Sequence, residues 1–252
     1  MRAAPKLTWI ELKLFFREPM ALIFSFAFPF FVMFILAGVF GNDIDANDPE
    51  SLRVWRGVGP TDYYVPAYVG IVMASMGLIS LPLRLAGYRE RGVLRRFRAA
   101  GFPAGAIIVS QVAVALGIAA VGAVAITVSS AVIYGTQFPE MPLATLGAWL
   151  LGAGTFAAIG IFLGAMLPTA RSAQGGGLIL FFMMMFISGG GPPRGALTDS
   201  MRTVSDFLPL THVVLMLQDT WLGEGWNTSA SAITAAFCAV TAAAGTLRFR
   251  WE

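Results

Sequence analysis

Six apolar runs, separated by short polar stretches, are the main pattern along this chain. A transmembrane helix needs about 20 apolar residues, because each residue advances the helix by about 1.5 Å across a hydrocarbon core about 30 Å thick. The runs are approximately residues 20–40, 65–85, 104–134, 142–167, 173–188 and 229–247. The pattern predicts an all-α integral membrane protein with six transmembrane helices in a single domain over residues 1–252.

The fifth run differs from the others because glycine triplets bound it at Gly175–Gly177 and Gly189–Gly191. Glycine and proline interrupt membrane helices unless neighbouring groups satisfy the freed backbone. We therefore expect this helix to end near Gly189. The next stretch, 195–223, is only moderately apolar and predicts one or two short re-entrant or interfacial helices before the last span.

The N-terminal segment is amphipathic. Lys6, Lys13 and Arg17 fall on one narrow helical stripe, and apolar residues occupy much of the remaining surface. This pattern favours a helix that lies in the membrane interface and bends into the first span at Glu18–Pro19. The alternative is a helix that simply extends the first span inward.

The composition agrees with a membrane protein. Hydrophobic residues make up 57% of the chain and charged residues only 12%, whereas soluble domains carry about 25% charged residues. The net charge is +3, but the basic residues stand beside apolar runs instead of forming one patch, which argues against nucleic-acid binding.

The basic residues also predict an orientation. With both termini in the cytoplasm of a plasma-membrane protein, 13 of the 17 basic residues lie on the inner side, as the positive-inside rule requires. Arg84 stands at an inner helix end and is expected to snorkel towards the interface. The remaining four, on the outer side, are Arg53, Arg56, Arg194 and Arg202.

The sequence predicts no catalytic, cofactor-binding or metal-binding residue. The only lysines, Lys6 and Lys13, do not follow a phosphate-binding glycine loop, and a single cysteine and a single histidine form no metal cluster. His212 fits a structural hydrogen-bonding role better than a ligand or base. No ionisable residue lies deep in a span, which argues against a proton-coupled transporter and an intramembrane enzyme.

A cluster of arginines separates the second and third spans, in the stretch that ends "YRERGVLRRFRAAGFPAG". One interpretation is that the cluster only fixes topology or contacts lipid phosphates. The other is that the loop is a docking surface for a soluble partner, because arginine forms strong bidentate contacts with carboxylates.

Two motifs carry a resemblance to the permease subunits of type-2 ATP-binding-cassette exporters of drugs or lipids. In the first, Glu90, Arg91, Gly92 and Leu94 match the family pattern, whereas Val93 and Gly101–Pro103 depart from it. The second is an apolar run, Ser188–Gly189, a proline pair and then Leu208 to Thr211. The motifs occur in the expected order, and the resemblance covers nearly the whole chain.

The resemblance implies a half-transporter in the membrane. A second permease, identical or related, would complete the substrate path, and ATP and Mg would bind a separate cytoplasmic ATPase subunit. The coupling helix that meets this ATPase would include Glu90, Arg91, Gly92, Leu94, Arg95 and Phe97, with Leu94 and Phe97 as apolar anchors. The predicted outer gate comprises Ser188, Gly189, Pro192, Pro193, Leu208, Pro209, Thr211 and His212.

Other functions stay open from the sequence alone. A secondary transporter and a membrane anchor or assembly subunit without a substrate path are the alternatives. The glycine-interrupted fifth run argues against a plain anchor, which has no need of broken helices. Aromatic-rich stretches such as "FSFAFPFFVMF" suit an amphipathic drug-like or lipid-like substrate, although such residues also face lipid.

Overall fold

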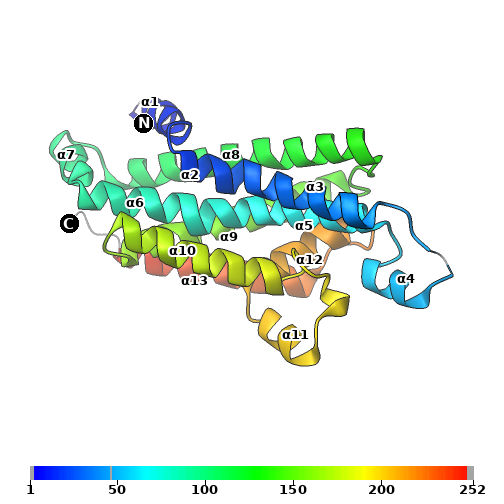
Figure 1. Ribbon diagram of the computed structural model, residues 1–252. Helices are drawn as coiled ribbons and strands as arrows, with labels where there is room; N and C mark the ends of the chain where they lie inside the picture. Colours follow the sequence, from blue (N-terminus) through cyan, green and yellow to red (C-terminus); the bar gives the residue numbers. More distant parts are fainter. Residues whose placement is uncertain (1–2, 46, 249–252) are drawn as a thin grey trace.

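The computed structural model describes residues 3–45 and 47–248, and every regular element in these ranges is helical. Six helical stretches are long and apolar enough to span a membrane, which confirms the predicted number (Figure 1). The spans, in chain order, are α2–η1–α3 (Pro19–Leu22, Ile23–Ala27, Phe28–Phe40), α5–η2–α6 (Pro60–Ser75, Met76–Ser80, Leu81–Glu90), α8 (Ala104–Tyr134), α9 (Pro142–Met166), α10 (Ala170–Ile187) and α13 (Thr228–Arg248).

Shorter helices occupy the two ends of the bundle. They are α1 (Ala3–Phe15), α4 (Pro49–Trp55), α7 (Val93–Ala99), η3 (Arg194–Ala196), α11 (Asp199–Ser205) and α12 (Pro209–Trp221). Figure 1 shows α1 and α7 at one end and α4 and α11 at the other. The end of α13 lies on the α7 side, where Arg248 contacts Met166 at the end of α9. We call these the α7 end and the α4 end.

The second span, Pro60–Glu90, is the central helix of the bundle. Nearly all its residues to Tyr88 are buried between the other spans. It begins five residues before the predicted run, because its polar first turn is satisfied by distant groups. The Asp62 carboxylate accepts hydrogen bonds from Asn42 Nδ2 at 2.9 Å and from the Gln137 N–H at 2.8 Å.

Two π-helical segments meet near the middle of the bundle. η1 in the first span and η2 in the second touch where Ser25 Oγ donates to Met76 Sδ at 4.0 Å. Glycines let α9 and α10 approach η2 closely: a Cβ added to Gly160 would lie 2.6 Å from Gly77 O, and one added to Gly177 would lie 2.0 Å from Leu78 O. Packing within this chain therefore explains both glycines.

The fifth span ends as the glycine pattern predicts. α10 stops at Ile187, and Gly189 adopts a φ of 90°, a left-handed conformation that glycine tolerates without strain. η3, α11 and α12 follow before the last span. α12 is an almost completely buried helix that packs against α5, α9 and α13.

Candidate functional site

The arginine-rich segment forms a turn and a short helix at the α7 end. α6 ends at Glu90, and Gly92, with a φ of 66°, reverses the chain into α7. Gly101, with a φ of 78°, then directs the chain into α8. Both glycines occupy the left-handed region that other residues avoid. The helix is shorter than the predicted coupling helix. Leu94, Arg95 and Phe97 lie in α7, whereas Glu90 ends α6 and Arg91 and Gly92 form the turn between the two helices.

One face of α7 packs against the protein itself. Leu94 is 2% exposed and belongs to a small apolar cluster with Leu7, Tyr88 and Ile107. Phe97 is half-buried, and its ring meets that of Tyr88 edge-on at a centroid distance of 6.4 Å. Leu94 is thus covered within the chain, whereas the sequence predicts an apolar anchor for a partner there. Leu94 instead fixes α7 to α1, α6 and α8.

The other face of α7 is strongly basic. Arg95, Arg96 and Arg98 are exposed, and their side chains form no hydrogen bond or ion pair within residues 3–45 and 47–248. Arg91 is also exposed, but its Nε donates to Gly87 O at 3.1 Å. Guanidinium groups presented in this way can bind carboxylates or phosphates bidentately.

The last turn of α6 is connected to the start of the fifth span. Glu90 Oε2 accepts a hydrogen bond from the Ala170 N–H at 2.8 Å, at the N-terminus of α10. Arg89 donates to Ala165 O at 3.0 Å and also to Leu167 O. A carboxylate at a helix N-terminus is favoured by the helix dipole. Glu90 and Arg89 therefore join the turn before α7 to the α9–α10 connection.

A buried ionic cluster attaches α1 to the central helix. Glu11 is 1% exposed and accepts a hydrogen bond from Tyr88 Oη at 2.7 Å. Arg84 is 4% exposed, lies 3.9 Å from Glu11 and 3.3 Å from Glu18, and covers the ring of Phe15. The expectation that Arg84 snorkels towards the interface is wrong. Its guanidinium stays buried because the carboxylates of Glu11 and Glu18 lie beside it within the protein.

The exposed surface of α1 keeps the amphipathic character predicted for it. Trp9, Ile10 and Phe16 are exposed apolar residues, and Lys13 and Arg17 are exposed basic residues. The side chain of Lys6 lies outside the described residues. This combination suits a helix at a membrane interface.

At the α4 end, two tyrosines of the central helix hold the segment that follows α10. Tyr64 Oη donates to Gly191 O at 2.8 Å, and Tyr63 Oη accepts from the Arg194 N–H at 3.2 Å. Gly190 lies so close to α5 that an added Cβ would be 2.6 Å from Ile71 Cδ1. The segment is therefore packed onto the bundle and is not a free loop.

Side-chain hydrogen bonds fix the corner between α11 and α12. Ser205 Oγ lies 2.9 Å from Thr211 Oγ1 and accepts from Arg194 Nη1 at 3.2 Å. His212 Nε2 lies 2.9 Å from the backbone oxygen of Asp206. This contact gives His212 a structural role, as its isolated position in the sequence suggests.

The predicted gate residues lie along this one segment, but their exposure differs. Ser188, Gly189, Pro193, Leu208, Pro209, Thr211 and His212 are buried, whereas Pro192 is exposed. The predicted gate residues do not meet the predicted ATPase-coupling residues. The gate segment contacts the first turns of the central helix, and α7 follows its last turn (Figure 1).

Sequence reasoning overlooked several residues that position these regions. Leu7, Glu11 and Phe15 are spaced four residues apart, so they share one face of α1, and all three are buried. This spacing in the sequence could have indicated that Glu11 is buried. Nothing in the sequence pairs Arg89 with the α9–α10 connection or Tyr64 with Gly191, because these contacts join residues distant along the chain.

The described chain is thus a six-span helical bundle with a short basic helix after its second span. Residues 6–222 match the family described as ABC-2 type transporter. The chain therefore belongs to this family. The matched region is the membrane (permease) domain of an ABC transporter, and ABC-2 permeases work with ABC ATPase subunits, which bind the ATP. No curated protein matches the chain.

Proposed function

We propose that the chain is half of an ATP-driven exporter in the plasma membrane, with both termini and α7 in the cytoplasm. A second permease, identical or related, completes the substrate path, and a cytoplasmic ATPase docks at α7. The distribution of basic residues supports this orientation, because the exposed arginines of α7 lie at the same end of the bundle as α1 and the end of α13.

The observation that carries the proposal is the two-sided nature of α7. Its buried face, through Leu94, is fixed to three other helices, and its arginine face is free of partners within the described chain. Glu90 and Arg89 connect the adjoining turn to the α9–α10 connection. A displacement imposed on α7 by an ATPase would therefore reach both the second and the fifth span.

The segment from Ser188 to His212 serves as the outer gate in this proposal. It lies at the opposite end from α7, and its backbone is held by side chains of the central helix. Interrupted helices persist at membrane depth only where protein or a water-filled cavity satisfies their backbone. The contacts of Tyr63 and Tyr64 provide such satisfaction, which supports a re-entrant arrangement.

We propose an amphipathic drug-like or lipid-like substrate. Phe24 and Phe28 of the first span pack against Phe181 and Phe182 of the fifth, with ring centroids between 5.5 and 6.2 Å apart. Phe186 on the same side of α10 is exposed. Aromatic surfaces of this kind favour apolar ligands.

The docking role is tested with the double variant Arg95→Glu/Arg98→Glu. Because these side chains have no partner in the described chain, the variant should insert and fold normally yet lose co-purification of the cognate ATPase. Lys13→Glu/Arg17→Glu, which reverses two exposed bases of the N-terminal segment, is the charge-matched control. Leu94→Asp should instead fail to fold.

Two alternative functions predict different results. If the double variant retains ATPase binding and transport but inserts in mixed orientation, the arginines serve topology alone. If the wild-type chain binds the ATPase but moves no substrate in proteoliposomes, the chain is an anchor.

A further inference from the structure

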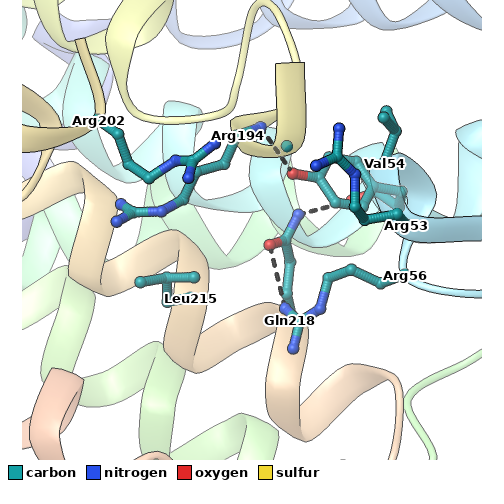
Figure 2. A pocket seen from close by; sticks show the side chains of 9 residues that line it. Arg53, Val54, Arg56, Arg194, Arg202, Leu215 and Gln218 are labelled. Carbon is teal, nitrogen blue, oxygen red and sulfur yellow. Dashed lines mark hydrogen bonds between the residues drawn. The ribbon is translucent and has the colours of Figure 1, made fainter. Parts of the chain in front are cut away.

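Four arginines from separate parts of the chain converge on one pocket at the α4 end. The pocket has a volume of about 290 Å³, and its lining includes Arg53 and Arg56 from α4 and its end, Arg194 from η3 and Arg202 from α11. In Figure 2, Arg194 and Arg202 approach from one side and Arg53 from the other, and α12 contributes Leu215 and Gln218.

This convergence is notable because arginine is scarce at this end. These four residues are all the basic residues that the sequence assigns to the side opposite α7. The four arginines are up to 149 residues apart in the sequence, so only the folded chain brings them together. No acidic residue is among the residues that line the pocket. What the pocket offers an anion therefore depends on which guanidinium donors its arginines leave unused.

Carboxylates outside the lining hold two of the four arginines in place. Arg56 pairs with Asp219 and Glu224, and Gln218 Oε1 accepts from Arg56 Nη1 at 3.4 Å. Arg194 pairs with Asp206. These contacts fix the positions of Arg56 and Arg194 and neutralise their charge, so the free donors of the other two arginines must carry the binding.

The other two arginines retain unused donors. Arg53 is exposed and forms no side-chain hydrogen bond or ion pair within the described chain. Arg202 donates to Leu197 O at 3.2 Å and lies 3.7 Å from Asp199, whose side chain is fully exposed. A guanidinium has five N–H donors, so within the described chain all the donors of Arg53 and several of Arg202 remain available.

We propose that this pocket binds a phosphate-bearing anion. Phosphate offers several oxygens to guanidinium donors and forms bidentate contacts with arginine. The volume of about 290 Å³ is at the small end for ligand sites and suits a headgroup or a small soluble phosphate. The phosphate can come from an anionic lipid beside the bundle or from free solution. The inference does not depend on the transport function proposed above.

Binding is measured with the purified full-length chain in an uncharged detergent, using pyrophosphate and a short-chain phosphatidylglycerol as probes. Arg53→Gln and Arg202→Gln should each weaken binding of at least one probe by roughly tenfold, and added salt should weaken it further. Arg171→Gln removes an exposed arginine at the α7 end and should bind as the wild type does. Arg53→Lys should restore part of the affinity.

The two probes distinguish the sources. Lipid binding that pyrophosphate displaces indicates a site for soluble phosphates, and lipid binding that pyrophosphate does not displace indicates a headgroup site that also needs the acyl chains. The proposal is overturned if neither probe binds, or if Arg53→Gln and Arg202→Gln bind both probes as tightly as Arg171→Gln. Because Arg53 contacts no partner in the described chain, its replacement tests binding without disturbing the fold.

Discussion

The carboxylate of Glu90 accepts a hydrogen bond from the backbone N–H of Ala170 at 2.8 Å, although 80 residues separate the two in sequence. This single contact joins the end of the second span to the beginning of the fifth. It lies one turn from the arginine face of α7. The contact therefore connects the proposed docking surface on α7 to α10, the fifth transmembrane helix.

Substitutions at Glu90 should separate ATPase binding from transport. Glu90→Lys places a positive charge at the N-terminus of α10, where the helix dipole disfavours it, and should abolish coupled transport while the ATPase still co-purifies. Glu90→Gln keeps an oxygen acceptor and should retain most of the coupling. The measurement is substrate moved per ATP hydrolysed in proteoliposomes. Wild-type coupling in Glu90→Lys would show that this link transmits nothing.

Removal of one tyrosine hydroxyl should loosen the gate segment. Tyr64→Phe deletes the hydrogen bond to Gly191 O and should lower the free energy of unfolding by about 0.5–1.5 kcal/mol. Tyr68→Phe, one turn further along α5, is the matched control, because the buried Tyr68 hydroxyl has no partner within the described residues. Chemical unfolding in detergent measures both. An equal loss in the two variants would mean that the Gly191 contact contributes nothing specific.

Thiol labelling tests whether the segment from Gly189 to Leu210 is a gate. In a Cys238→Ala background, Thr198→Cys should react with a membrane-impermeant maleimide, because Thr198 is exposed. Ser188→Cys and Ser205→Cys should be protected, because both serines are buried. Nucleotide binding to the partner ATPase should change the reactivity of the buried positions and leave Thr198 unchanged.

The same labelling experiment can reject the gate. Uniformly high reactivity at all three positions, independent of nucleotide, would describe an ordinary solvated loop. Reaction of Thr198→Cys in intact cells also reports on which side of the membrane the segment lies.

A double-mutant cycle should reveal strong coupling between Arg84 and Glu11. Arg84→Met leaves the buried carboxylate of Glu11 without its nearby cation and should lower the free energy of unfolding by about 3–5 kcal/mol. The double variant Arg84→Met/Glu11→Gln should recover part of that loss, because the unpaired charge is gone. Additive losses would show that the two residues contribute independently.

The sequence predicts the spans best where apolar runs are long and end at proline or glycine. α8 begins and ends at the predicted residues, 104 and 134, and α9 ends one residue from the prediction. The second span was predicted too short at its start, since Asp62 and its neighbours look polar until Asn42 and Gln137 are placed beside them. A sequence pattern does not contain such distant partners.

For the candidate site, too, the sequence predicts local features and misses contacts between residues that are distant along the chain. Composition locates the arginine-rich turn and helix and the glycine-interrupted end of the fifth span along the chain, because glycine and arginine are local signals. The inward orientation of Leu94 could not be predicted, because it depends on Leu7 and Ile107 in two other helices. The two π-helical segments could not be predicted from the sequence either, because the wider helical turn does not change the apolar composition of the span.

The central helix can act as a lever. Its three segments contain 16, 5 and 10 residues, which gives a length of about 45 Å at about 1.5 Å per residue. A tilt of roughly 5° about its α7 end would carry the far end about 4 Å sideways over that length. The hydrogen bond of 2.8 Å from Tyr64 to Gly191 is lost well before such a displacement is complete, since hydrogen bonds fail beyond about 3.5 Å. A tilt of a few degrees at α7 is thus large enough, at the opposite end, to break a hydrogen bond that holds the proposed gate.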